Sequence, residues 1–231
     1  MSEGVNLIRN RNLDYLHSPD SANFNKLSGE LAETGKIFYS RGWVLGTSGN
    51  FSAVTSRRPL RVVISSTGLD KGSLTPAHFV EIDGVANVIR GDGRPSTEVL
   101  LHLAIIDSLN VGAVLHTHSV WSTTLSHIHA SQGGIDIEGY EMLKGLAGVR
   151  THEHREWLPI LGNSQDMTEL SQNISAILRT HPCIHGFLLH GHGLYGWGAS
   201  LLEAKRHIEV LEFLLEVLVR SNQSTQRIRG I

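Results

Sequence analysis

The stretch that decides the fold reads Val111-Gly112-Ala113-Val114-Leu115-His116-Thr117-His118. Its apolar first half predicts a buried strand, and two histidines separated by one residue end it. Side chains alternate across a strand, so His116 and His118 lie on one face and Thr117 on the other. A buried strand has little reason to end in two imidazoles on one face unless something binds them. The stretch therefore predicts a strand that carries two metal ligands.

A second apolar run also ends in histidine. Residues 184–190 predict another strand, which continues as His190-Gly191-His192-Gly193. A third histidine from this distant segment would complete three protein ligands and one open position, the arrangement typical of catalytic zinc. Spacing alone does not decide between His190 and His192, because both adjoin glycines that let the backbone approach closely.

Helices and strands alternate irregularly around these two strands. The apolar spacing predicts helices over residues 22–41, 96–109, 120–128, 167–179 and 200–220. It predicts further strands over residues 51–55, 61–66, 79–83, 85–90 and 157–161. Thr75-Pro76 has the pattern of a helix N-terminus, and residues 131–150 give no clear assignment. The alternation predicts a layered sheet with mixed strand directions and helices packed on its faces.

Composition limits the classes of function. The 231 residues suit one domain with a substantial core, and we expect a flexible N-terminal segment over residues 1–20 before a single domain over residues 21–231. A net charge of -2 without a basic block argues against a nucleic-acid partner. No apolar stretch is long enough to predict a membrane span. A single cysteine, Cys183, and the lack of an apolar signal core predict a soluble cytoplasmic protein.

Three segments have the composition of anion-binding loops. Two combine glycine with hydroxyl side chains, at residues 46–50 and 65–68, and the third is a helix start at Ser96-Thr97. Each alone is more often an ordinary turn, and none has the pattern of a nucleotide-binding P-loop. Together, beside a metal candidate, they predict a phosphate site formed by Thr47, Ser48, Gly49, Asn50, Ser66, Thr67, Gly68, Ser96 and Thr97, with Lys71 as a further candidate to neutralise charge.

Glu98 is a carboxylate close to these segments. It lies in the first turn of the predicted helix, four residues before His102, so the two side chains share a helix face. It is either part of the site or a carboxylate that stabilises the helix N-terminus. The residues alone leave both interpretations open.

Taken in order, these motifs resemble those of the class II aldolase family. The family pattern Gly-Thr-x-Gly-Asn, Thr-Gly, Pro-Ser-x-Glu, His-x-His and His-Gly appears here at residues 46–50, 67–68, 95–98, 116–118 and 192–193. The resemblance runs from about residue 25 to residue 220 and implies an α/β fold, a three-layer α/β/α sandwich around a mainly antiparallel central sheet. It also implies one zinc ion per subunit held by His116, His118 and His192, and a ring-shaped homotetramer with sites near subunit interfaces.

Three further segments are similar to those of family members that dehydrate a sugar phosphate. They lie at residues 68–72, 138–145 and 192–198. The resemblance implies zinc-dependent loss of water from 5-methylthioribulose 1-phosphate, a step of methionine salvage. In such relatives the acid/base group is the glutamate of Glu-Met-x-Lys-Gly, here Glu141, whereas aldolase relatives use the glutamate at the position of Glu98. We therefore expect Glu141 to be the catalytic acid/base and Glu98 to support the metal or the substrate.

Two alternatives remain. A sugar-phosphate aldolase or 4-epimerase would begin with the same metal-bound keto sugar phosphate, and fold does not separate these reactions. A non-catalytic interaction module would be expected to have lost metal ligands, which this chain retains. For the methylthio end of the substrate, Trp121, Tyr140 and Met142 are candidate pocket residues.

Overall fold

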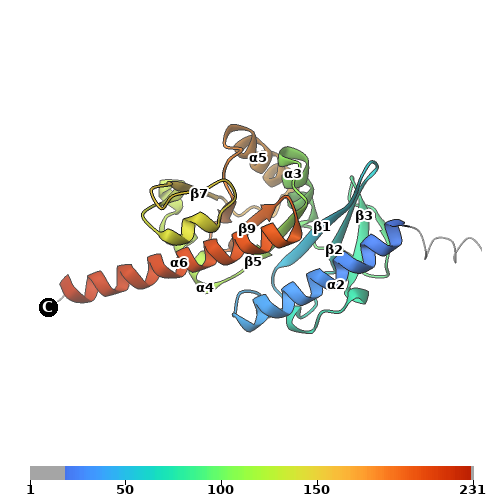
Figure 1. Cartoon of the computed structure of the whole chain (residues 1–231), viewed down its shortest axis with the longest axis horizontal. Helices are drawn as coiled ribbons and strands as arrows, with labels where there is room; N and C mark the ends of the chain where they lie inside the picture. The colour runs from blue at the N-terminus through green and yellow to red at the C-terminus, as the bar shows by residue number, and fades with distance from the viewer. Residues whose placement is uncertain (1–18, 230–231) are drawn as a thin grey trace, which may run out of the picture.

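A computed structural model describes residues 19–229 of the chain (Figure 1). Its helices are α2 (Pro19–Ser40), α3 (Val99–Leu109), α4 (Val120–Ile128), α5 (Met167–Thr180) and α6 (Leu201–Arg229). Its strands are β1 (Asn50–Arg57), β2 (Leu60–Ser65), β3 (Phe79–Asp83), β4 (Val88–Arg90), β5 (Ala113–Thr117), β6 (Gly134–Ile137), β7 (Glu156–Leu161), β8 (Gly186–Leu189) and β9 (Gly193–Gly198). Single 3-10 turns are η1 (Lys71–Ser73), η2 (Pro76–His78), η3 (Ala130–Gln132) and η4 (Glu141–Gly145).

The described strands form one nine-stranded sheet in the order β4-β3-β2-β1-β5-β9-β8-β7-β6. Neighbouring strands run antiparallel throughout, except that β7 and β8 are parallel. The strand that ends in His116 therefore lies at the centre of the sheet, with β1 on one side and β9 on the other. The mainly antiparallel sheet expected from the sequence is confirmed.

Two helical layers cover the two faces of the sheet. One core cluster joins side chains of α2, α4 and α6 to one face, and a second joins α3 and α5 to the other. Alternation within β5 divides the strand between them, because Ala113 and Leu115 belong to the first cluster and Val114 to the second. Figure 1 shows α2 and α6 across the lower front of the molecule and α3 and α5 on its upper side. The predicted three-layer sandwich is confirmed.

Local signals explain several element boundaries. Ser119 begins α4 with its hydroxyl accepting from the Ser122 N–H, and Asp166 caps α5 in the same way through Thr168 and Glu169. Thr75-Pro76 does begin a helical turn, but it is the single turn η2 rather than a longer helix. The first helix begins at Pro19, before the predicted residue 22, so the flexible segment expected over residues 1–20 falls almost wholly outside the described residues.

Two strands were not expected from the sequence. β9 carries glycine at three of its six positions, Gly193, Gly196 and Gly198, which conceals its strand character. The glycines are required by close packing, since a Cβ on Gly193 would lie 2.1 Å from the Thr117 carbonyl oxygen. β6 occupies the unassigned stretch and pairs with β7 at the edge of the sheet.

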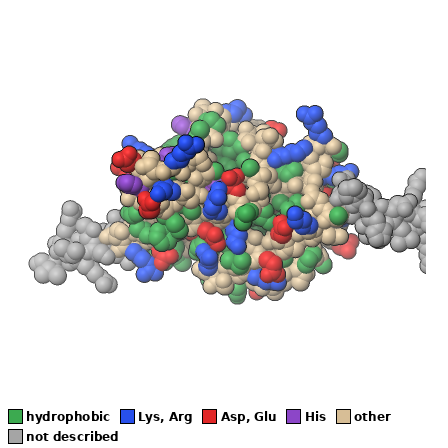
Figure 2. All heavy atoms as spheres, in the orientation of Figure 1, with side chains coloured by type: hydrophobic (Ala, Val, Ile, Leu, Met, Phe, Trp, Pro, Cys, Tyr) green, Lys and Arg blue, Asp and Glu red, His purple; other side chains and the backbone are tan. Residues whose placement is uncertain are grey.

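The surface carries both signs of charge. Figure 2 shows Lys and Arg side chains interspersed with Asp and Glu over the visible face, and the chain has 20 basic and 22 acidic residues. Each helix within residues 19–229 is too short or too polar to cross a bilayer.

Candidate metal and active site

The site is built on a row of side chains across three central strands. In the register of the sheet, His116 on β5 pairs with Asn50 on β1 and with Tyr195 on β9. Residues paired in this way point to the same face, here the face covered by α3 and α5. The Tyr195 ring stacks on the His116 imidazole with centroids 3.9 Å apart. The sheet register thus fixes the position of the first candidate metal ligand, His116.

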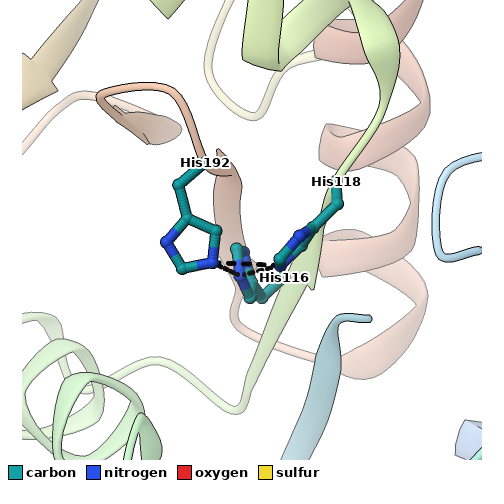
Figure 3. Close-up of side chains that lie close together, drawn as sticks. All are labelled: His116, His118 and His192. Carbon is teal, nitrogen blue, oxygen red and sulfur yellow. Dashed lines mark hydrogen bonds between the residues drawn. The ribbon is translucent and has the colours of Figure 1, made fainter. Parts of the chain in front are cut away.

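Three imidazoles converge at this end of the row. His116 and His118 leave β5 on one face, and His192 comes from the turn between β8 and β9 (Figure 3). Their Nε2 atoms lie 2.7 Å (His116–His118), 3.1 Å (His118–His192) and 3.3 Å (His116–His192) apart. As predicted, Thr117 points the other way and its hydroxyl donates to Glu212 on α6. The structure also separates His190 from the cluster, because its Nε2 lies 3.2 Å from His127 Nδ1.

The protonation of these rings suits a metal ion. His116 Nδ1 donates to the Leu194 carbonyl oxygen at 3.0 Å, which leaves an unprotonated Nε2 facing the other two rings. Burial lowers the pKa of His116 well below its usual value and that of His118 to about 4, so both rings stay neutral. A tetrahedral zinc ion with Zn–N distances of about 2.0–2.1 Å holds its nitrogen ligands roughly 3.3 Å apart. The three histidines therefore fit a metal of this kind.

Glu98 adjoins the three histidines. It precedes α3 directly, and its Oε1 lies 3.3 Å from His192 Nε2 and 3.7 Å from His116 Nε2. Its Oε2 accepts from the Asn50 amide nitrogen and from the Ser96 hydroxyl at 3.4 Å. Of the two interpretations left open above, the structure supports a carboxylate that belongs to the site. Its side chain makes no hydrogen bond to the first turn of α3.

Tyr195 brings a second buried oxygen to this region. Its side chain is fully buried, and its hydroxyl has no hydrogen-bond partner among the described residues. Burial, with the nearby Glu98 carboxylate adding to it, raises the pKa of Tyr195 well above its usual value. The hydroxyl therefore keeps its proton beside Glu98.

A small cavity of about 110 Å³ lies on one side of the cluster. Its walls come from the three segments predicted to bind phosphate, together with Lys71 and two side chains of the candidate metal site. The lining residues are Thr47, Ser48, Gly49, Asn50, Ser66, Thr67, Gly68, Lys71, Ser96, Glu98 and His118. Of the predicted phosphate residues only Thr97, which is exposed, does not line it.

Two features of the cavity suit an anion. Lys71 is buried, and its ammonium donates to the carbonyl oxygens of Thr47 at 2.9 Å and Leu69 at 2.8 Å, which leaves one of its three protons. Burial lowers its pKa to about 8, with the opposing charges of Asp70 and Glu98 acting against the shift. The buried Ser48 hydroxyl has no partner within residues 19–229. Both groups have unused donors for a phosphate oxygen.

A larger pocket of about 540 Å³ opens on the other side of His118. It shares Ser48 and His118 with the small cavity and adds His192, Asn163 and Gln165. Its apolar wall comes from Leu45 and Val120, whose exposed fractions of 55% and 68% are high for such side chains. The candidates named from the sequence for an apolar pocket, Trp121, Tyr140 and Met142, do not line it.

Glu141 lies elsewhere in the chain. The carboxyl ends of β5, β7 and β8 lie at the same end of the sheet as the histidines. β6 runs antiparallel to β7, so its carboxyl end lies at the opposite end of the strands. Glu141 follows β6 by four residues. Its side chain is 71% exposed and contacts Lys144 and His152, neither of which lines either pocket described above. Within one chain, the carboxylate beside the histidines is that of Glu98.

Sequence reasoning gave no role at the site to three side chains that support it. Asn163 accepts from His192 Nδ1 at 3.4 Å, Tyr195 stacks on His116, and His102 contacts Asn50. The i, i+4 spacing of Glu98 and His102 was a usable signal for the last of these. Tyr195 could have been found only by recognising β9 as a strand, and Asn163 had no signal because it lies in a loop.

The comparisons with known proteins identify the family of the chain. Residues 29–219 match the family model described as Class II Aldolase and Adducin N-terminal domain, and the chain belongs to this family. A methylthioribulose-1-phosphate dehydratase of Pseudomonas syringae pv. tomato is 42% identical over 192 residues, covering 83% of this chain and 93% of that protein. A protein of the same name from Sorangium cellulosum is 38% identical over 197 residues, covering 84% and 92%.

Solved structures show the same fold at lower identity. A putative aldolase/epimerase/decarboxylase from Escherichia coli superposes with a TM-score of 0.70 at 24% identity, covering 85% of this chain and 89% of that chain. An L-fuculose 1-phosphate aldolase superposes with a TM-score of 0.69 at 21% identity, covering 84% and 85%. At these identities the likeness supports the fold.

Proposed function

We propose that the protein removes water from 5-methylthioribulose 1-phosphate to give 2,3-diketo-5-methylthiopentyl 1-phosphate, a hydro-lyase step of methionine salvage. The observation that carries the proposal is the convergence of three imidazole Nε2 atoms and the Glu98 carboxylate beside a cavity lined by hydroxyls and Lys71. The relatives that match most of the chain at about 40% identity carry the same activity in their names. Both the donor set and the anion cavity suit a keto sugar phosphate.

His116, His118 and His192 would hold one zinc ion per subunit. When bound, zinc supplies a Lewis acid that polarises the C2 carbonyl and so makes the neighbouring C3 hydrogen more acidic. Hydrogen bonds from His116 Nδ1 to the Leu194 carbonyl oxygen and from His192 Nδ1 to Asn163 orient the rings for this task.

The reaction breaks the C3–H and C4–O bonds. A carboxylate takes the C3 proton, the C4 hydroxyl leaves as water once a proton is donated to it, and the resulting enol rearranges to the diketone. Within one chain, Glu98 is the carboxylate placed for the first step, because its Oε1 faces the metal ligands. The Tyr195 hydroxyl keeps a proton beside it.

The two pockets give the substrate a direction. The C1 phosphate fits the small cavity, where Ser48 and Lys71 have unused donors. The C2 and C3 oxygens then face the histidines, and C5 with its methylthio group points into the larger pocket beyond His118. The exposed side chains of Leu45 and Val120 would contact the apolar methylthio group there.

Glu141 keeps the acid/base role that the family resemblance implies only if it reaches the substrate from another copy of the chain. A homotetramer with sites at subunit interfaces would allow this, with Glu141 of one subunit near the histidines of its neighbour. In that arrangement Glu98 and Glu141 would share the two proton transfers. A phosphorylated sugar as substrate also favours a cytoplasmic location for the enzyme.

The test is to incubate the purified, zinc-loaded protein with 5-methylthioribulose 1-phosphate and to analyse the products by mass spectrometry. Loss of one water with an intact carbon chain is the expected result. Cleavage between C3 and C4 would identify an aldolase, and an isomer of unchanged mass with altered retention would identify a 4-epimerase. Binding of zinc without any turnover of the substrate would reject the dehydratase.

A further inference from the structure

We propose that His102 is a positioning residue for Glu98, because as a neutral ring protonated on Nε2 it fixes the Asn50 amide that holds the Glu98 carboxylate. The inference rests on the proposed role of Glu98 at the metal site. It assigns a function to a fully buried histidine that is neither a metal ligand nor a substrate contact.

Four side chains from two elements form a continuous hydrogen-bonded chain. Ser52 Oγ lies 2.7 Å from His102 Nδ1, His102 Nε2 contacts Asn50 Oδ1, and Asn50 Nδ2 contacts Glu98 Oε2. Asn50 and Ser52 are two residues apart on β1 and so point to one face, while Glu98 and His102 lie one helical turn apart. Two side chains of β1 therefore contact the two ring nitrogens of His102 on α3, one each.

The acceptor at one end sets the direction of every bond. The Asn50 amide nitrogen faces Glu98 Oε2 and can only donate, and its oxygen faces His102. That oxygen only accepts, so His102 must carry its proton on Nε2. The remaining lone pair on Nδ1 then accepts from the Ser52 hydroxyl. Burial lowers the pKa of His102 to about 3, which keeps the ring neutral as this pattern requires.

This series of hydrogen bonds decides which oxygen of Glu98 faces the candidate metal ligands. Oε2 is held by Asn50 and Ser96, so Oε1 is left 3.3 Å from His192 Nε2. An apolar side chain at position 102 would leave the buried Asn50 oxygen without a donor, and the amide could then turn its oxygen toward the carboxylate. A histidine that only filled space would have no such effect on Glu98.

The kinetic test compares His102→Gln with His102→Leu. Gln can still donate from its side-chain nitrogen to Asn50, whereas Leu has a similar volume without the donor. We expect His102→Leu to lower kcat by roughly 10–100-fold with KM and zinc content unchanged, and His102→Gln to restore most of the rate. In a Glu98→Gln background, His102→Leu should cost nothing further. Equal losses in the two variants, or a full additional loss in the Glu98→Gln background, would overturn the proposal.

A second readout does not depend on turnover. Neutron diffraction from crystals of the metal-free protein would locate the deuterons on His102 and Asn50. We expect a deuteron on His102 Nε2, none on Nδ1, and the Asn50 amide nitrogen toward Glu98. A deuteron on Nδ1 or a reversed amide would show that His102 does not position Glu98 through Asn50. If the deuteron pattern holds but the protein does not dehydrate the substrate, the proposed function fails and the positioning of Glu98 stands.

Discussion

At the scale of single residues, the two histidines of His190-Gly191-His192 have different surroundings. The His192 ring points at His116 and His118, while His190 is exposed and contacts His127. A glycine between them, with a φ of +63°, turns the backbone so that the two rings diverge. Spacing in the sequence left the two histidines equivalent, whereas the structure places only His192 beside the other two candidate ligands.

We expect His192→Ala to lose stoichiometric zinc and His190→Ala to retain it. Removing one of three ligands leaves a two-imidazole site, which binds zinc far more weakly. Metal content after dialysis, measured by atomic emission, checks the prediction. His116→Ala is the positive control for loss of metal. Retention of zinc by His192→Ala together with its loss from His190→Ala would reverse the assignment.

At the scale of elements, the glycine-rich loop before β1 combines close packing with unusual backbone geometry. Gly46, Thr47 and Gly49 all have positive φ, and Thr47 at +70° is rare for a residue with a branched side chain. Strained backbone of this kind clusters at ligand-binding sites, and this loop lines the anion cavity. Gly46 and Gly49 both have positive φ, but only Gly49 is closely packed, so substituting each in turn separates the effect of backbone conformation on stability from the effect of steric contact.

Gly49→Ala should be much more destabilising than Gly46→Ala. A Cβ on Gly49 would lie 2.6 Å from the His116 carbonyl oxygen, whereas nothing lies within 4 Å of a Cβ on Gly46. We expect a loss of about 1 kcal/mol in the free energy of unfolding for Gly46→Ala, from its positive φ alone. For Gly49→Ala we expect about 3 kcal/mol, with weaker zinc binding because His116 must move. Urea unfolding measures both, and equal losses would contradict the packing argument.

Glu212, a buried carboxylate on α6, contacts β5 on the face opposite His116. Glu212 Oε1 accepts from the Thr117 hydroxyl, and its Oε2 has no partner among the described residues. Burial raises its pKa to about 7, with the nearby hydroxyls of Ser119 and Thr117 opposing the shift and Glu216 adding to it. The folded chain therefore keeps a proton that the unfolded chain loses near pH 4.5.

This difference predicts a pH-dependent effect of Glu212→Gln. The contribution of the group to stability is full below pH 4.5 and is lost as the pH rises to about 7, since the folded state binds more protons in that window. Gln cannot ionise, so the variant should gain on the order of 3 kcal/mol relative to the parent between pH 4.5 and pH 8. Urea unfolding at several pH values measures the difference, with Glu209→Gln on the same helix as the control. A constant difference across this range would show that Glu212 stays ionised in the fold.

The success of sequence reasoning followed the strength of local pattern. Apolar periodicity located α4, α5 and β5 to within a residue or two, and the period of two placed His116 and His118 on one face. β9 was missed because its glycines are required by close packing against β5 and α6, and the sequence alone does not show these contacts. His102 was noted beside Glu98, but its partners lie about fifty residues away on β1, and such pairings depend on the sheet register.

At the scale of the whole molecule, one chain separates two carboxylates that the reaction is proposed to use. Glu98 lies beside the histidines, whereas Glu141 follows the carboxyl end of β6, at the opposite end of the strands. The sheet is packed on both faces, so we do not expect side-chain movement to bring the two together. If both act on one substrate, they must come from different subunits, which makes oligomerisation a requirement for catalysis.

Mixing two inactive variants tests this requirement. We expect Glu98→Gln and Glu141→Gln each to retain zinc and to lose most dehydratase activity as homo-oligomers. Co-expression at equal levels gives sites that combine an intact Glu98 with an intact Glu141 of a neighbour, and random assembly predicts about a quarter of the parental activity. Light scattering measures the oligomer, and differently tagged chains allow the mixed species to be purified. A monomer, or mixed oligomers no more active than either parent variant, would exclude Glu141 from a shared site. Full activity of the Glu141→Gln homo-oligomer would leave Glu98 as the acid/base for both proton transfers.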